Sequence, residues 1–226
     1  MEYLLKKFKH EVGSMLEPMG FKLKNKWFYV RITEEKVCQV IELCKRPFIS
    51  LKFMSRPLFI GKSSYSLSSG AWIGKEWYNF KKDEAIYNEI ISEMVEITKT
   101  ELIPFFEKTE TIEGAYQAEV EGNSMGRDSF LAKYKAREGD CKPITEYLKW
   151  WIEDSKNAEK ANVASYRKNG FFTEEEIQQY SKRMEKERLE IKERLDFFTN
   201  SSPEAIAEYF SANEEEALIE LKWKFE

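Results

Sequence analysis

Strand-like alternation is confined to one part of this 226-residue sequence, and helical periodicity occupies most of the remainder. In residues 21–24, apolar and charged side chains alternate with a period of two, which is the pattern of a half-buried strand. In the strand predicted over residues 27–32, Phe28, Val30 and Ile32 are expected on one face, and Trp27, Tyr29 and Arg31 on the other. Before residue 20 and beyond residue 83, apolar side chains recur at steps of three and four, which predicts helices. Because strands joined by short turns pair with their neighbours, we expect an α+β fold, with an antiparallel β-meander packed against helices and a helical C-terminal region.

The first helix is separated from the strands by a stop signal. Pro18 disfavours helical backbone at the residue before it, and Gly20 can adopt the left-handed conformation that commonly ends a helix. We therefore expect the helix to end at this point. It should lead into a hairpin whose turn is formed by Asn25 and Lys26.

Further strands are expected before residue 75. Residues 37–45 and 48–54 have strand-like composition and short connections. Residues 57–61 and 65–74 contain short apolar runs bounded by glycine or proline, and they predict short or edge strands.

From residue 83 onward the sequence predicts helices alone. Asp83 is expected to cap the first of them, and Pro104 is expected to kink or end it. Thr173 and Glu176 have the spacing of a capping box, in which a side chain and a backbone amide bond reciprocally. Later helices are predicted over residues 143–161, 173–198, 202–210 and 214–225.

A polar, glycine-containing segment at residues 121–128 marks the expected boundary between two parts of the chain. We predict an α+β module over residues 1–122 and a helical C-terminal region over residues 123–226 that packs on it. Residues 1–82 hold 16 Lys and Arg against 7 Glu, whereas the rest of the chain holds 20 basic and 33 acidic residues. Either the first part attracts an acidic partner, or the two parts neutralise each other.

The first half of the chain resembles a known family. The resemblance rests on the opening helix and its "GFK" corner at residues 20–22, the aromatic segment around Trp72, Trp77 and Tyr78, and "ELIPFFEK" at residues 101–108. Residues 1–122 resemble the bacterial domain-of-unknown-function family numbered 4304. The resemblance implies a bacterial origin and an α+β module, and it implies no catalytic residue, because the family has no agreed activity.

Charge and cysteine content indicate a cytoplasmic protein. Charged residues interrupt the N-terminal segment, which is unlike a signal peptide, and no stretch approaches the length of a membrane span. If Cys38 and Cys44 share one strand, they lie roughly 20 Å apart. A disulfide needs Cα atoms within about 7 Å, so with Cys141 they are expected to be free thiols in a reducing compartment.

Residues for acid–base or nucleophilic chemistry are scarce. His10 is the only histidine, and it stands beside lysines, which disfavour a proton or a metal ion there. The "IGKSS" segment at residues 60–64 lacks the preceding glycine of a phosphate-binding loop, because that position is Arg56. We predict no catalytic residue, no metal site and no cofactor. An enzyme remains an alternative, using carboxylates or a metal in a cleft lined by Trp72, Trp77, Trp150 and Trp151.

One strand combines aromatic and positive side chains that could form a binding surface. Such mixtures hold single-stranded nucleic acid, and Trp, Tyr and Arg are also frequent anchors in protein interfaces. An aromatic row on a sheet is also commonly buried beneath a helix, so a packing role is the other explanation. The candidate binding residues are Lys22, Lys24, Lys26, Trp27, Tyr29 and Arg31.

These observations favour a non-enzymatic binding or accessory protein with a macromolecular partner. Another protein is favoured over nucleic acid, because a sequence pI near 5.5 disfavours broad attraction to phosphate. Nucleic-acid binding through the basic N-terminal half is the first alternative, and the carboxylate- or metal-dependent enzyme is the second.

Overall fold

The computed structural model divides the chain into two compact units, one of residues 1–127 with 210–226 and one of residues 128–209. The structure describes residues 2–44, 49–61, 71–77, 83–122 and 127–225. The division after residue 127 falls within the polar segment expected to contain a boundary, and its residues 123–126 lie outside the described residues. The last residues of the chain, expected in the C-terminal region, group with the sheet.

The first unit opens with a helix that changes its winding twice before it ends. α1 (Glu2–Phe8) continues through a π-helical turn (Lys9–Gly13) into α2 (Ser14–Leu16), and a 3₁₀ turn (Glu17–Met19) closes the segment. Gly20 has φ +89°, so the left-handed exit predicted from the sequence is confirmed.

The antiparallel meander predicted from the sequence is confirmed by a five-stranded sheet in the order β1-β2-β3-β4-β5. Each strand pairs in the antiparallel sense with the next strand along the chain. The strands are β1 (Lys22–Asn25), β2 (Phe28–Ile32), β3 (Val37–Cys44), β4 (Ile49–Pro57) and β5 (Ala71–Trp77).

The prediction of a short strand at residues 57–61 is wrong for all but Pro57, which is the last residue of β4. Leu58–Ile60 form a 3₁₀ turn. The Leu58 amide donates to the Lys36 carbonyl and the Gly61 amide donates to the Leu58 carbonyl, so the chain leaves the sheet here. Of the other expected short strand, residues 65–70 lie outside the described residues and the end lies in β5.

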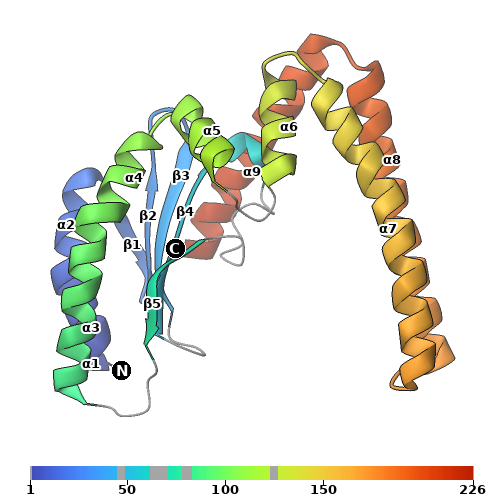
Figure 1. Ribbon diagram of the computed structural model, residues 1–226. Coiled ribbons are helices and arrows are strands. Elements are labelled where there is room, and N and C mark those ends of the chain that lie inside the picture. The colour runs from blue at the N-terminus through green and yellow to red at the C-terminus, as the bar shows by residue number, and fades with distance from the viewer. Residues whose placement is uncertain (1, 45–48, 62–70, 78–82, 123–126, 226) are drawn as a thin grey trace. The chain divides into compact units, whose positions relative to one another are not determined.

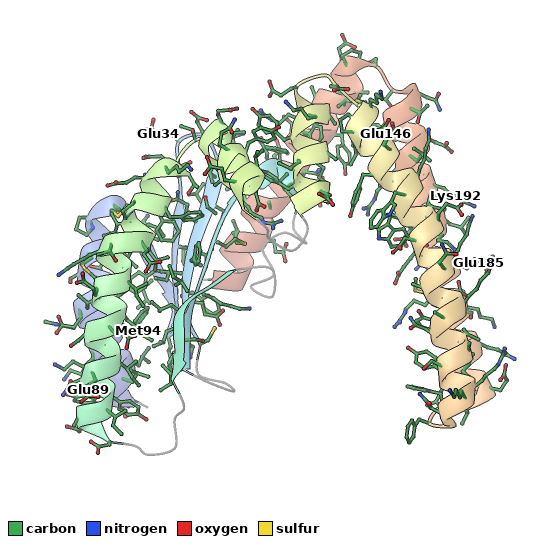
Figure 2. All side chains as sticks on the ribbon, in the orientation of Figure 1. Glu34, Glu89, Met94, Glu146, Glu185 and Lys192 are labelled. Atoms are coloured by element: carbon green, nitrogen blue, oxygen red, sulfur yellow. The ribbon has the colours of Figure 1, made fainter. Side chains whose placement is uncertain are left out.

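Three helical segments cover one face of the sheet (Figure 1). After the sheet come α3 (Glu84–Ile97), a π-helical turn (Thr98–Leu102), α4 (Ile103–Lys108) and α5 (Ile112–Glu121). Side chains of α1, α3 and α4 form one apolar core with alternate residues of the strands. In Figure 2, Met94 of α3 belongs to this buried layer, whereas Glu89 lies on the exposed side of the same helix.

The predicted cap of the first of these helices is confirmed, whereas the helical path continues through Pro104 instead of ending before it. The Asp83 carboxylate accepts a hydrogen bond from the Ala85 amide and caps α3. α3 ends at Ile97, and Pro104 lies in the first turn of α4, where its missing N–H costs nothing. The intervening π turn lets the helical path continue across the proline.

The other face of the sheet is covered by the end of the last helix, α9 (Pro203–Phe225). Ala217 and Leu221 pack there against a cluster that includes Val30, Val40 and Met54. The interruption expected between residues 210 and 214 is wrong, since α9 is continuous. Ser211 and Asn213 weaken a helix only slightly, Ala212 favours it, and packing outweighs the small cost.

The second unit is helical, as predicted for this part of the chain. It contains α6 (Arg127–Arg137) from Asp128 onward, α7 (Lys142–Asn169), α8 (Glu174–Asn200) and the start of α9. The capping box expected at Thr173 is present, with both reciprocal hydrogen bonds formed to Glu176.

A close approach between the first helix and the sheet depends on glycine. Gly13 is buried in the π turn, directly over Tyr29 of β2. A Cβ atom at this position would lie 2.0 Å from the Tyr29 hydroxyl oxygen, well inside van der Waals contact. Only glycine therefore lets the helix lie this close to the sheet.

Candidate functional site

The residues predicted to form one binding surface are divided between the two faces of the sheet. Tyr29 is 1% exposed beneath the first helix, with its ring centroid 6.0 Å from that of Phe8. Burial, and secondarily the charge of Glu17, raise the pKa of the Tyr29 phenol. Arg31 follows two residues later on the same strand and pairs with Glu110. Tyr29 therefore has a packing role and cannot act as a surface stacking platform.

The lysines of the predicted surface lie elsewhere. Lys22 is directly opposite Val30, so it shares the face that α9 covers, and Lys26 lies in the turn. Trp27 packs partly buried against the core beneath α1. Because β1 is an edge strand, Lys22 and Lys24 also discourage pairing with a second sheet. A binding role for the lysines stays a prediction.

A thiol and a carboxylate meet on β3 without the electrostatics of a catalytic pair. Burial, then the charge of Glu42 and its hydrogen bond with the thiol, raise the pKa of Cys44 to about 12. Burial also raises the pKa of Glu42, against the opposing effects of Cys44 and Lys52. Reactive cysteines have lowered pKa values, so Cys44 is a protonated thiol and a poor nucleophile near neutral pH.

This arrangement predicts strongly graded thiol reactivity. The pKa of buried Cys38 is also raised to about 12, so a thiolate fraction of about 10⁻⁴ is expected for Cys38 and Cys44 at pH 8. Cys141 is half-buried, so Ellman's reagent should modify it first in the native protein, although burial raises its pKa as well. The other two thiols should react only in denaturant. Cys141→Ser should abolish the native reaction, and rapid native modification of Cys44 would contradict the prediction.

The other chemical candidates from the sequence are not brought together. The side chain of His10 is 80% exposed and contacts Glu11. The part of the chain that the structure describes contains no group of three or more His, Cys, Asp or Glu placed to hold a metal ion. Lys62, Ser63 and the side chains of Trp72 and Trp77 lie outside the described residues.

No helix within the described ranges is both long enough and apolar enough to cross a lipid bilayer.

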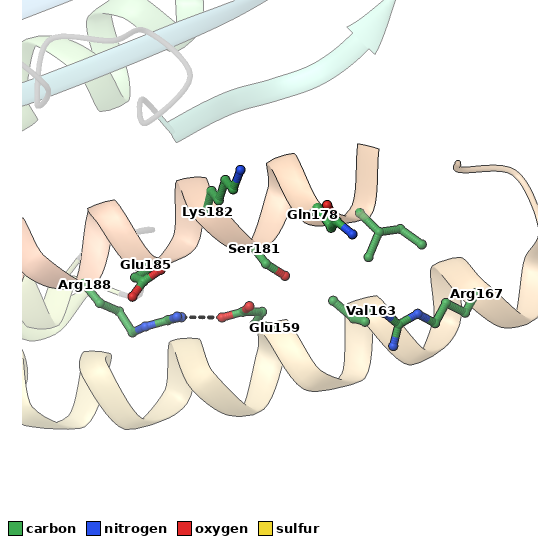
Figure 3. Close-up of a pocket in the computed structure, with 9 residues that line it drawn as sticks. Glu159, Val163, Arg167, Gln178, Ser181, Lys182, Glu185 and Arg188 are labelled. Atoms are coloured by element: carbon green, nitrogen blue, oxygen red, sulfur yellow. Dashed lines mark ion pairs between the residues drawn. The ribbon is translucent and has the colours of Figure 1, made fainter. Parts of the chain in front are cut away.

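The most distinctive surface belongs to the hairpin formed by α7 and α8, which pack side by side (Figure 1). Glu159 and Arg188 pair across the two helices at 2.6 Å, with side chains 19% and 14% exposed (Figure 3). Partial burial removes solvent screening, so this pair fixes the register of the helices more strongly than a surface pair would. The Asn162 amide donates to the Tyr180 hydroxyl at 2.9 Å and adds a second link.

A charged groove of about 340 Å³ lies beside this ion pair. Ser181, Lys182 and Glu185 of α8 line it together with residues of α7 (Figure 3). Two of the three cations that line it are already paired, Arg188 with Glu159 and Arg167 with Glu174, so the groove has no strong preference for ligands of either charge.

The end of the hairpin presents aromatic side chains to solvent. Phe171 is 86% exposed and Phe172 is 46% exposed, in the short connection between α7 and α8. The helices are tied together beside this connection by Arg167, whose Nη2 lies 2.5 Å and Nε 3.2 Å from the two oxygens of Glu174. The exposed rings therefore stand on an ordered support.

A second pocket, of about 420 Å³, is lined in part by Phe172. Tyr166 contacts the rings of Phe172 and Tyr180, with centroids 4.5 and 5.5 Å apart, and Arg183 lies over the Tyr180 ring at 5.4 Å. Glu176 and Gln179 complete the lining. We call these six residues the aromatic pocket.

Sequence reasoning missed this end of the hairpin. The helices on either side were predicted, and the capping box at Thr173 placed the connection, but Phe171 and Phe172 were not singled out. The available signal was a pair of aromatic residues next to Gly170, at a position where a helix must already have ended. Of the adjacent tryptophans, Trp150 is 57% exposed and Trp151 is half-buried, which agrees with the different directions expected on a helix.

No protein-family model, curated protein or solved structure matches this chain.

Proposed function

We propose that the protein is a non-enzymatic binding protein that engages a protein partner through the end of the α7–α8 hairpin. The observation that carries this proposal is the 86% exposure of Phe171 beside the half-exposed Phe172. An exposed phenylalanine gives up the favourable free energy of burial, and aromatic side chains are enriched where proteins associate. A partner that covers both rings would recover that free energy.

The charges of the hairpin unit support a protein partner over nucleic acid. Residues 128–209 contain 15 Lys and Arg against 17 Asp and Glu. Nucleic-acid affinity arises mainly from neutralised phosphates, which requires an excess of cations on one surface. The alternative surface around Lys22, Lys24 and Lys26 retains that excess, and nucleic-acid binding there is the second candidate function.

Cysteine chemistry supports a cytoplasmic location for this function. Cys38, Cys44 and Cys141 are free thiols. Secreted proteins of this size usually pair their cysteines, whereas the reducing cytoplasm keeps them free. We therefore place the partner in the cytoplasm, of a bacterium if the resemblance of residues 1–122 to the family numbered 4304 holds.

The proposal is tested by comparative capture. The tagged full-length chain is incubated with nuclease-treated bacterial lysate, beside the variant Phe171→Ser/Phe172→Ser and a matched control, Lys22→Ser/Lys24→Ser/Lys26→Ser. We expect a protein that the wild type and the lysine variant retain and the phenylalanine variant loses. That protein is then purified, and its binding to the same three chains is measured by calorimetry.

Two outcomes would overturn the proposal. The first is a reconstituted partner that binds the phenylalanine variant as tightly as the wild type. The second is capture from untreated lysate, run in parallel, that depends on the lysines and is absent from the nuclease-treated lysate, which would support the nucleic-acid alternative. Thermal unfolding of each variant shows whether it is folded. Phe171, Lys22 and Lys26 are exposed, so their replacement should change stability by less than about 0.5 kcal/mol each, whereas Lys24 and Phe172 are partly covered.

A further inference from the structure

We infer that the aromatic pocket at the end of the hairpin receives a proline-rich segment of the partner, with an acidic residue following the prolines. This inference rests on the proposed function, because it names the chemistry of the partner at the same end of the hairpin. It is carried by the geometry of three rings, by the hydrogen-bonding groups beside them and by one cation.

The rings suit proline. Tyr166, Phe172 and Tyr180 line a pocket of about 420 Å³, and the ring plane of Tyr166 lies at 47° to that of Phe172 and at 79° to that of Tyr180. Flat aromatic faces set at an angle accept the pyrrolidine rings of a polyproline II helix. Such a segment is already extended and stiff, so its binding costs little conformational entropy.

The hydrogen-bonding groups suit a ligand rich in acceptors. The Tyr180 oxygen already accepts from Asn162, which leaves its hydroxyl proton to be donated to a ligand. In contrast, Oε2 of the lining acid Glu176 already accepts from the amide and the hydroxyl of Thr173. A proline segment has no N–H to donate and carries unpaired carbonyl oxygens, so it can accept the hydrogen bond that the Tyr180 hydroxyl has left to donate.

The cation that lines the pocket favours a ligand with a negative charge. Arg183 lies over the Tyr180 ring, its side chain is 67% exposed, and its nearest carboxylate is Glu187 at 3.9 Å, one turn along α8. An exposed pair at this distance is weak, so the guanidinium can take a carboxylate from the ligand. We therefore expect an acidic residue next to the prolines.

The test uses a capped peptide of ten prolines followed by two glutamates, titrated into the full-length protein by calorimetry. A second peptide has glycine in place of every other proline. Tyr166→Ala should weaken binding of the proline peptide roughly tenfold, because it removes one stacking face. Arg183→Ala should weaken the glutamate-bearing peptide more than an uncharged decaproline, because only the glutamates can pair with the guanidinium. Gln178→Ala is the matched control, since this residue of α8 lines the charged groove and should leave affinity unchanged.

The result separates this inference from the proposed function. If the proline peptide does not bind at millimolar concentration, or binds no better than the glycine peptide, the inference is overturned. The proposed function then still stands wherever capture depends on Phe171 and Phe172. Equal binding by the Tyr166→Ala variant and the wild type would also overturn it, because the peptide would then occupy another surface.

Discussion

Replacement of Gly13 by alanine is expected to destabilise the protein by about 2–3 kcal/mol, the cost of overpacking a well-filled core. The added Cβ would lie 2.0 Å from the Tyr29 hydroxyl oxygen and 2.7 Å from its Cζ atom. Neither partner can move easily, because Tyr29 is 1% exposed and Gly13 lies within a helix packed on the sheet. Helix propensity alone would predict that Gly13→Ala stabilises the protein, since alanine is favoured over glycine in a helix by about 1 kcal/mol. Whether the free energy of unfolding falls or rises therefore shows whether overpacking against Tyr29 or helix propensity is the larger effect.

Urea unfolding measures this change in stability. An unaltered dependence of the unfolding free energy on urea concentration would show that the variant exposes the same surface on unfolding. Tyr29→Phe in the alanine background should recover part of the loss, because it removes the nearer of the two atoms in conflict. Ser14→Ala is the matched control, since Ser14 is the next residue along the helix and is exposed. A neutral or stabilising effect of Gly13→Ala would show that the helix shifts at little cost.

Replacement of Arg56 by methionine is expected to cost about 3–5 kcal/mol, because it removes a cation that pairs with a buried carboxylate. Arg56 of β4 and Glu119 of α5 lie 3.5 Å apart with side chains 6% and 11% exposed. Desolvation of the remaining charge dominates the loss. The further change Glu119→Leu should therefore recover most of the stability, although it removes a second polar group.

The chain offers a matched control for this pair. Lys108 and Glu121 also form an ion pair near α5, with side chains 48% and 63% exposed. Lys108→Met should cost no more than about 1 kcal/mol, because solvent screens an exposed pair. Equal losses in thermal or urea unfolding for Arg56→Met and Lys108→Met would show that burial does not control the strength of the pair at Arg56.

Local structure followed from the sequence where it depends on neighbours along the chain. The alternation of residues 21–32 indicated the strands, and the Asp83 cap and the Thr173 capping box placed two helix starts. The continuity of α9 was not predicted. Of the three residues between its expected halves, Ser211 and Asn213 are only modest helix formers, and the helix is stabilised by Ala217 and Leu221, which pack on a sheet distant in sequence.

The candidate site was predicted less well, because exposure depends on what lies above a residue. Period-two alternation correctly placed Tyr29 and Val30 on opposite faces of β2, but both faces are apolar enough to be buried. The sequence therefore could not decide whether Tyr29 was a surface platform or core. The sequence likewise did not show that Phe171 and Phe172 are exposed, since aromatic residues next to a glycine can be either buried or exposed.

The sequence by itself determined the order of strands and helices, the antiparallel meander and the helix caps, because each arises from residues within a few positions of one another. Only the tertiary structure decided that helices cover both faces of the sheet, that Tyr29 is buried beneath Gly13, and that two phenylalanines stay exposed at the end of a hairpin. These outcomes depend on contacts between residues far apart in the chain, which the local pattern of apolar and polar side chains does not specify.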